Sequence, residues 1–350
     1  MGVDVVRFEM SAPDDSRHLR EILHSKSAHE AERIAIVGKT EGTATINDFG
    51  RALATRAIHD ALADARVQVE PHIILSMGSE GIISPGGYLF IDVPSRNTAF
   101  PGLALGLASS PPLKPAVMMT DGHIEAAREA TQRAIGDAGL SEADVALVLS
   151  KNPLLTRDAA VDLAPEQKAF ANLSWASRGI AALGIGIALG EVDPREARPS
   201  IVGRRHDIFS RRAMVFSGTE TSRIEILVLG NRVGAPPAIR SGQVRDIIDI
   251  DGLAKIVTEG GGLDAVRALC NADGIVASFL KGNVAPDGKV RGRRTTVYSS
   301  EVDPDKHMRA VASGVLGALL GDTRFFVSGG AEHQAPPGGG IFAIIQKQQA

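Results

Sequence analysis

Three kinds of side chain that can act together on a carbonyl group recur in the same order along this chain. In each of three segments, an apolar run ends at a lysine, an arginine follows near the start of a stretch of small residues, and a second apolar run ends at a serine. The lysines are Lys39, Lys151 and Lys281, the arginines are Arg51, Arg178 and Arg309, and the serines are Ser76, Ser217 and Ser328. A serine attacks a carbonyl only when a base accepts its proton, and a lysine can be that base when burial and nearby cations lower its pKa.

The residues that follow two of the serines are glycines, Gly218 and Gly329, which suit a turn at the end of a strand. Such a turn exposes backbone N–H groups that can bind an oxyanion as it forms. Three such sets around one axis would face a small, flat ring with alternating carbonyl and N–H groups, such as a six-membered cyclic imide or ureide. Taken singly, each lysine, serine or arginine is more often a structural residue, so the prediction depends on their recurrence in order.

The elements that must position these residues alternate between strand and helix. Short apolar runs predict strands before each lysine and each serine, and the alanine-rich stretches between them predict helices, the third of which Asp303 and Pro304 would cap. This alternation predicts the α/β class, with three strand-helix-strand repeat units arranged with threefold pseudo-symmetry around a central barrel-like core and a single active site. Pro-rich linkers place the predicted repeat units at residues 1–107, 112–238 and 245–350.

Other readings of the sequence fail on spacing or composition. Gly38-Lys39-Thr40 ends like a phosphate-binding loop, but Arg33 stands where that motif needs a glycine. Cys270 is the only cysteine, so an internal disulfide is excluded. The formal net charge of −3 gives no case for nucleic acid or an anionic membrane, and no apolar run approaches the length of a membrane helix. We expect a cytoplasmic protein with a small-molecule partner, no nucleic-acid partner and no membrane association.

Several stretches of the chain resemble a known protein family. The stretch 37–42, Val-Gly-Lys-Thr-Glu-Gly, is similar to the first repeat of the ring-opening amidohydrolases, the family of cyanuric acid hydrolases and barbiturases. The stretches 291–295 and 326–334 resemble its third repeat, and the second of them, which runs on to Gly338-Gly339-Gly340, is the most specific. The resemblance covers nearly the whole chain and is weakest in about the first 30 residues and at 191–212.

The resemblance implies a role for each recurring residue. It makes Ser217 the nucleophile and Lys151 its general base. Substrate binding would fall to the other serines, the arginines, the residues after the serines and the remaining lysines: Arg51, Ser76, Met77, Arg178, Gly218, Arg309, Ser328, Gly329, Lys39 and Lys281. It also implies a homotetramer, no cofactor for catalysis, and a structural Mg²⁺ or Ca²⁺ near the C-terminal glycine-rich loop. The residues that would hold this cation are Ala331, Gln334, Ala335, Pro336 and Gly339.

This chain departs from the family pattern at four positions. Met77 stands where the family usually has glycine after the first serine, and its thioether would narrow the accepted ring. Gly86 and Thr295 stand where histidine is common. Asn283 replaces a pattern that usually includes an acidic residue, and an amide is a poorer ligand for a hard cation. These departures predict a family member whose substrate has shifted.

Several functions remain open from the sequence. The first is hydrolysis of a non-peptide C–N bond, in which cyanuric acid would give carboxybiuret and then biuret, or barbiturate would give ureidomalonate. A family member acting on a different cyclic amide is the nearest variant. A non-catalytic small-ligand binding protein on the same scaffold is an alternative of another class, as is an isomerase or lyase that uses lysine as a base without an acyl intermediate.

Overall fold

The structure is a computed structural model that describes residues 2–43, 45, 47–93, 98–271 and 274–348. Its main strands form three four-stranded sheets. The first sheet contains β1 (Gly2–Glu9), β2 (Arg33–Thr40), β3 (His72–Met77) and β4 (Gly86–Val93). The second contains β5 (Leu103–Ser109), β6 (Val145–Pro153), β7 (Ala213–Gly218) and β8 (Glu225–Asn231). The third contains β9 (Ile239–Val244), β10 (Ile275–Gly282), β13 (Phe326–Gly329) and β14 (Gly340–Gln346).

The three sheets share one strand order, in which the first strand pairs with the fourth, the fourth with the second, and the second with the third. In each sheet the second and third strands are parallel, and the other two pairings are antiparallel. The parallel pair is β2–β3, β6–β7 or β10–β13, and its strands carry the lysine and the serine of one recurring set. The prediction of an α/β fold is confirmed.

One strand lies in a different sheet from the one that the predicted unit limits imply, and another falls between two predicted units. Residues 103–107, which the predicted first unit included, form part of β5 and pair with β8 of the second sheet. Strand β9, which falls before residue 245, pairs with β14 of the third sheet. The first Pro-rich linker follows β5 rather than preceding it, so it does not mark the change from one sheet to the next.

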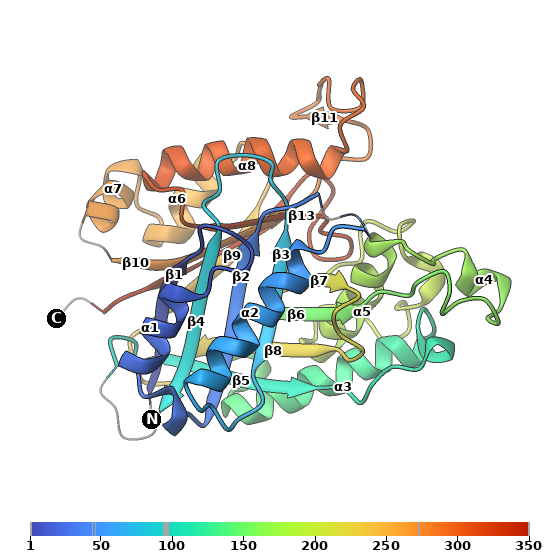
Figure 1. Cartoon of the computed structure of the whole chain (residues 1–350). Coiled ribbons are helices and arrows are strands. Elements are labelled where there is room, and N and C mark those ends of the chain that lie inside the picture. The colour runs from blue at the N-terminus through green and yellow to red at the C-terminus, as the bar shows by residue number, and fades with distance from the viewer. Residues whose placement is uncertain (1, 44, 46, 94–97, 272–273, 349–350) are drawn as a thin grey trace.

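Each parallel pair is connected by a helix with an arginine near its start. These helices are α2 (Gly50–Asp64), α5 (Ser174–Ala188) and α8 (Pro304–Leu320). Asp303 caps α8 by accepting a hydrogen bond from the backbone of Asp305, as predicted. Helix α8 runs across the top of Figure 1, and the hairpin of β11 (Lys289–Val290) and β12 (Arg293–Arg294) projects beyond it.

The remaining helices cover the sheets or cross the surface. They are α1 (Arg17–Ser25), α3 (Asp121–Ala138), α4 (Pro165–Lys168), α6 (Ile250–Thr258) and α7 (Leu263–Asn271), with short 3-10 turns at Ala28–Glu30, Pro115–Val117, Glu142–Asp144 and Pro199–Ile201. Helices α3 and α5 approach closely, since a Cβ on Gly184 would lie 2.2 Å from the carbonyl oxygen of Ile124. This close contact explains the small residues of α5, which the sequence predicts as a packing face.

The central core is built from all three sheets. Side chains alternate along each strand, so that Ala35 and Val37 of β2 face this core whereas Ile34 and Ile36 face the helices α1 and α2. Phe216 of the second sheet meets Phe326 of the third edge-on, with ring centroids 5.3 Å apart. Among the described strands no hydrogen-bonded pairing joins one sheet to another, so the expected barrel-like closure is not confirmed. The sheets meet through side chains instead.

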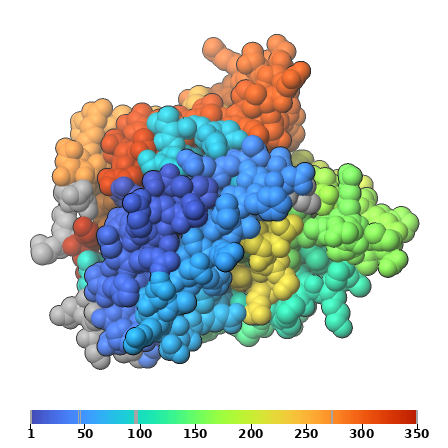
Figure 2. Space-filling view, viewed as in Figure 1, coloured from blue at the N-terminus to red at the C-terminus, as the bar shows by residue number. Residues whose placement is uncertain are grey.

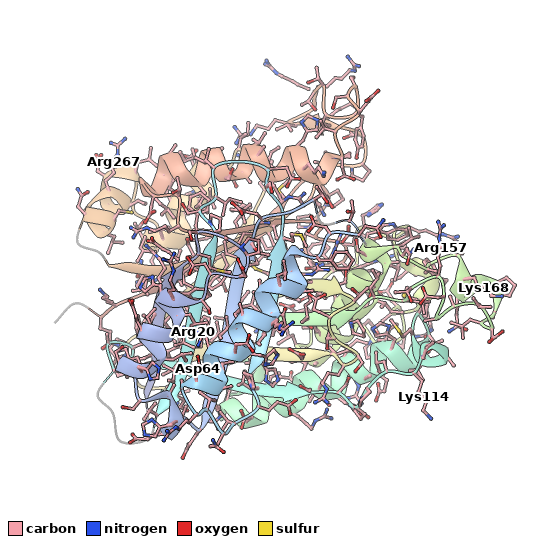
Figure 3. All side chains as sticks on the ribbon, in the orientation of Figure 1. Arg20, Asp64, Lys114, Arg157, Lys168 and Arg267 are labelled. Atoms are coloured by element: carbon pink, nitrogen blue, oxygen red, sulfur yellow. The ribbon has the colours of Figure 1, made fainter. Side chains whose placement is uncertain are left out.

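At the surface, the three parts of the chain adjoin one another, and several charged side chains lie at separate points. In the space-filling view the blue, green-to-yellow and orange-to-red parts adjoin on one face (Figure 2). Arg20 of α1 forms an ion pair with Asp64 at the end of α2, and Lys114, Arg157 and Lys168 project at separate points (Figure 3). No helix in the described part of the chain is long and apolar enough to span a bilayer.

Candidate active site

A cavity of about 370 Å³ lies where the ends of the three parallel strand pairs meet. All three recurring serines and all three recurring arginines line it. From the predicted binding residues, Met77, Lys281 and Gly329 also line this cavity, whereas its lining does not include Gly218, Lys39 or Lys151. The sequence therefore located one cavity from three distant segments, although two of its lysines lie behind the cavity wall.

The three serines do not have equivalent surroundings. Ser76 Oγ and Ser328 Oγ are hydrogen-bonded to each other at 3.2 Å, whereas Ser217 Oγ donates to the backbone oxygen of Ser174 at 3.1 Å. In the strand pairing, Ser76 lies opposite Lys39 and Ser328 lies opposite Lys281. In the second sheet, the pairing between the lysine strand and the serine strand is displaced by one residue.

In that sheet Ser217 lies opposite Asn152, and Lys151 lies opposite Phe216. The shift matches the shorter turn after Ser217, where the glutamate follows three residues later instead of four. Ser217 therefore differs from the other two serines in its neighbours as well as in its position in the sequence.

The three lysines are buried, and each has a lowered pKa. Burial lowers the pKa of Lys39 to about 7, helped by the positive charge of Arg309. Burial likewise lowers the pKa of Lys151 to about 8, with Arg51 contributing and Glu220 opposing. Burial and Arg178 hold the pKa of Lys281 well below its ordinary value. A buried ammonium is costly, so burial at these sites raises the fraction of neutral amine, the form that a general base requires.

The contacts of the lysine amines differ from set to set. Lys151 Nζ donates to the backbone oxygen of Leu75 at 2.9 Å and lies 2.5 Å from a carboxylate oxygen of Glu220. Lys281 Nζ donates to the backbone oxygen of Gly329 at 2.9 Å and lies 4.6 Å from the ring centroid of Phe216. Lys39 Nζ has no hydrogen-bond partner among the described residues. Within the same residues, no lysine amine is hydrogen-bonded to a serine hydroxyl, so catalysis would require a side chain to turn.

Three glutamates complete the site, although no role was predicted for them from the sequence. Each follows one of the serines and pairs with an arginine from the helix of another sheet. The pairs are Arg51–Glu220 at 2.7 Å, Arg178–Glu332 at 2.9 Å and Arg309–Glu80 at 2.8 Å. The signal that could have found them is their recurrence three or four residues after each serine.

These ion pairs set the charge of the cavity. Burial raises the pKa of Glu220, but Lys151 and Arg51 outweigh this effect and hold it below its ordinary value. Arg178 does the same for Glu332 against the effect of burial. The carboxylates are therefore ionised and balance the guanidinium groups, so the three arginines enter the cavity as charge-paired hydrogen-bond donors. Such a cavity suits a neutral or weakly acidic ring with several carbonyl groups.

The C-terminal loop is closed by hydrogen bonds at the positions where the resemblance implies a cation. Asn283 Oδ1 accepts from the backbone of Gly338 at 2.8 Å, and its Nδ2 faces the Ala331 oxygen at 3.4 Å. The Ala331 oxygen also accepts from the Gln334 backbone at 2.9 Å, and the Gly339 oxygen accepts from the Asn283 backbone at 3.1 Å. These loop groups include no carboxylate, and the Ala331 oxygen, one of the implied cation ligands, already faces N–H groups of Asn283 and Gln334. The loop therefore does not fit Mg²⁺ or Ca²⁺ well.

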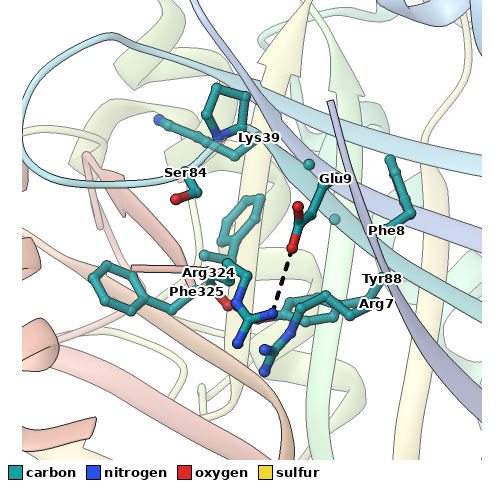
Figure 4. Close-up of a pocket in the computed structure, with 12 residues that line it drawn as sticks. Arg7, Phe8, Glu9, Lys39, Ser84, Tyr88, Arg324 and Phe325 are labelled. Carbon is teal, nitrogen blue, oxygen red and sulfur yellow. Dashed lines mark hydrogen bonds and ion pairs between the residues drawn. The ribbon is translucent and has the colours of Figure 1, made fainter. Parts of the chain in front are cut away.

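A second hollow, between β1, β4 and β13, has a different character. It is lined by Arg7, Glu9 and Tyr88 among others, and Arg324 forms an ion pair with Glu9 at 3.4 Å across it (Figure 4). Its volume of about 10 Å³ is that of a single water molecule. It cannot hold a six-membered ring, so the candidate active site is the cavity that the three serines and three arginines line.

Fold and site together agree with what comparison with known proteins shows. A family model described as "Amidohydrolase ring-opening protein" matches residues 4–347. The chain therefore belongs to the ring-opening amidohydrolase family, and its class of enzyme is that of the amidohydrolases.

Individual relatives span the same length. The chain is 35% identical to a cyanuric acid amidohydrolase of Ectopseudomonas oleovorans and 34% identical to a cyclic amide hydrolase of Azorhizobium caulinodans, with 99% of each chain covered. A solved cyanuric acid hydrolase from A. caulinodans has 31% identity and a TM-score of 0.86, again with 99% of both chains covered. Another solved cyanuric acid hydrolase has 29% identity, a TM-score of 0.85 and the same coverage.

Proposed function

We propose that this enzyme opens a six-membered cyclic imide or ureide by hydrolysing one ring amide, with Ser217 as nucleophile and Lys151 as general base. The observation that carries the proposal is that serines and arginines from three sheets line one cavity. Candidate reactions are cyanuric acid to carboxybiuret, which loses carbon dioxide to give biuret, and barbiturate to ureidomalonate. The names of the relatives support the first substrate, and the departures of this chain leave another cyclic amide open.

The proposed chemistry proceeds in two halves. Ser217 Oγ forms a bond to a ring carbonyl carbon while its proton passes to neutral Lys151, and the oxyanion accepts hydrogen bonds from backbone N–H groups near Gly218. The ring C–N bond then breaks, and the leaving nitrogen takes the proton from Lys151. Water attacks the resulting acyl-serine with Lys151 again accepting a proton, and the Ser217 hydroxyl is regenerated.

The remaining polar residues would hold the ring. Ser76 and Ser328 lie together and would bind a second carbonyl group, with Gly329 beside them. Arg51, Arg178 and Arg309 would donate to the other oxygens from the three helices. Lys39 and Lys281 would lie beneath them as further hydrogen-bond donors.

Met77 would limit which ring fits. Its side chain is buried and lines the cavity, and its sulfur packs so closely on Gly42 that a Cβ there would lie 2.1 Å away. The thioether is therefore held in place as a wall. We expect this wall to exclude substituents that a glycine at the same position would admit.

The architecture supports a further part of the proposal. We infer that the three sheets with their helices are repeat units related by a threefold pseudo-axis through the cavity, since strand order and strand direction are the same in each. The units would begin near β1, β5 and β9, close to the limits predicted at 1–107, 112–238 and 245–350. Assembly into a homotetramer is proposed from the resemblance alone.

Catalysis as proposed needs no cofactor, and we propose that Asn283 takes over the structural role of a cation. Its amide connects the Ala331 oxygen with the Gly338 backbone across the loop. Gln334 connects the same loop to β7 by accepting a hydrogen bond from Val215 at 2.7 Å. The loop would thus be held without Mg²⁺ or Ca²⁺ at Ala331, Gln334, Ala335, Pro336 and Gly339.

Trapping of the intermediate tests the nucleophile. Acid quenching during turnover, followed by peptide mapping, should find the added mass of the opened ring on the peptide that contains Ser217. Ser76→Ala and Ser328→Ala serve as controls and should retain this adduct. An adduct on Ser76 or Ser328 in the wild-type enzyme would reassign the nucleophile, and turnover without any adduct would favour a lysine-base mechanism without an acyl intermediate.

A further inference from the structure

A chain of buried polar groups lies behind Ser217 and is not used in the proposed chemistry. It consists of His123 on α3, Asn152 on β6 and Ser177 on α5, and none of the three side chains is more than 1% exposed. His123 Nε2 lies 2.9 Å from Asn152 Oδ1, and Asn152 Nδ2 lies 2.7 Å from Ser177 Oγ and 2.6 Å from the Ser177 backbone oxygen. These polar side chains connect the three elements inside an otherwise apolar layer.

The direction of each hydrogen bond in this chain is determined. The backbone N–H of Met119 donates to His123 Nδ1 at 3.2 Å, so the ring proton must be on Nε2 and must point to Asn152 Oδ1. The Asn152 amide group then has to turn its N–H bonds toward Ser177, whose hydroxyl donates onward to the Pro153 oxygen at 2.5 Å. Burial lowers the pKa of His123 to about 4, so the ring is neutral at ordinary pH.

Two members of this chain, Asn152 and Ser177, lead to the reacting groups. Asn152 follows Lys151 on β6 and lies opposite Ser217 in the strand pairing. Ser177 precedes Arg178 and lies one turn after Ser174, whose backbone oxygen accepts the Ser217 hydroxyl proton at 3.1 Å. The chain therefore ties the strand of the base to the helical turn that orients the nucleophile.

The other two sets have no corresponding support. The residue after the lysine is Thr40 in the first sheet and Gly282 in the third. Thr40 Oγ1 has no hydrogen-bond partner among the described residues, and glycine has no side chain to offer. Three otherwise similar serines thus differ in whether a fixed polar chain stands behind them.

We propose that His123, Asn152 and Ser177 form a positioning relay that holds the first turn of α5 against β6 and thereby orients Ser217 for attack. This inference rests on the proposed role of Ser217 as the nucleophile. His123 is a positioning residue, because it acts only through Asn152 and does not touch the cavity. The relay explains why one of three related sets would carry the chemistry: its serine has a defined orientation, whereas Ser76 and Ser328 bond to each other.

Variants of His123 test the relay through kcat compared with KM in folded protein, which a loss of stability alone does not change. His123→Leu removes the donor that fixes the Asn152 amide, and we expect kcat to fall about 10- to 100-fold, with KM changed much less, because the nucleophile is misplaced while the ring-binding groups remain. His123→Gln can again donate to Asn152 and should restore most of kcat. Thr131→Val, a change at another buried polar residue of α3, is the matched control and should leave kcat unchanged.

All assays are made well below the melting temperature of each variant, with the folded fraction measured by circular dichroism. Equal kcat in folded His123→Leu and in the control would overturn the relay, as would a loss of kcat that His123→Gln shares in full. If His123→Leu does not fold, Ser177→Ala removes only the acceptor hydroxyl and should lower kcat in the same direction, and an unchanged kcat there overturns the proposal. Ser217→Ala in the same assay separates the two ideas. Loss of turnover in Ser217→Ala together with unchanged kcat in His123→Leu refutes the relay alone, whereas full activity of Ser217→Ala refutes the nucleophile and, with it, the relay.

Discussion

Lys151 combines the two properties that a general base needs, namely burial and a neighbouring cation. Its pKa of about 8 leaves about a tenth of the amine neutral at pH 7. Because the neutral form would accept the proton of Ser217 in the proposed mechanism, kcat/KM should rise with pH and level off above about 8. A pH–rate profile, measured on a substrate that does not itself titrate in this range, checks the pH at which kcat/KM stops rising.

Glu220 offers a sharper form of the same prediction. Its carboxylate raises the pKa of Lys151, so Glu220→Gln should move the rising limb of kcat/KM to lower pH. Glu80→Gln, which removes the corresponding carboxylate beside Arg309, is the control and should leave the midpoint much nearer that of the wild type. A midpoint that stays in place in Glu220→Gln, or moves upward, would show that Lys151 is not the group that titrates.

Lys39 is expected to lower the stability of the fold, because its buried amine has no hydrogen-bond partner among the described residues. Lys39→Met should raise the free energy of unfolding at pH 7 by about 1–4 kcal/mol, the range seen when buried charges give way to apolar side chains. The folded-state pKa of about 7 lies below the ordinary 10.5, so the unfolded chain binds more protons between these values and wild-type stability rises with pH across them. The gain in the variant should therefore be largest below pH 7 and shrink toward pH 10.5. Urea unfolding at several pH values measures it, and destabilisation at every pH would contradict this account.

At the scale of elements, the C-terminal loop distinguishes this chain from the pattern that its resemblance implies. Asn283 joins β10 to the loop by hydrogen bonds, so chelation with EDTA should leave the melting temperature unchanged. Asn283→Glu would supply the missing carboxylate, and its melting temperature should rise when Ca²⁺ or Mg²⁺ is added. Metal analysis of the purified wild-type protein provides the check: a stoichiometric divalent cation whose removal lowers the melting temperature would refute the role given to Asn283.

The local elements were largely predictable from the sequence, whereas the way they meet was not. Apolar runs ending at Lys39 and Ser76 predict two strands of one strand-helix-strand unit, and the structure pairs these two residues directly in parallel strands. The one-residue shift that puts Ser217 opposite Asn152 depends on pairing between strands, which side-chain periodicity along one strand does not encode. For the same reason, the sequence does not show that β5 belongs to the second sheet and β9 to the third.

Contacts between units were the least predictable part of the site. Arg51, Arg178 and Arg309 were identified from their recurrence, but their partners belong to the neighbouring sheet in each case. Such pairs depend on how three sheets converge, and no local pattern specifies it. The sequence shows Glu80, Glu220 and Glu332 as a repeated residue type. Their role follows only from the ion pairs with arginines that the structure shows.

At the scale of the whole molecule, no single sheet contains the site. The cavity takes a serine from each sheet and an arginine from each connecting helix, and every arginine–glutamate pair crosses from one sheet to another. The site therefore forms only when all three sheets pack around the common core. In the proposed function, a ring in this cavity would therefore be contacted by residues from all three sheets.

Ring opening itself is the measurement that tests the central claim most directly. Loss of ultraviolet absorbance is followed for cyanuric acid, barbituric acid, uracil, dihydrouracil, hydantoin and N-substituted analogues, with the wild type and Ser217→Ala side by side. We predict turnover of at least one six-membered ring by the wild type and loss of that turnover in Ser217→Ala, with binding of the ring retained. Binding without turnover in the wild type across the panel would contradict the proposed hydrolysis and favour a small-ligand binding protein on this scaffold.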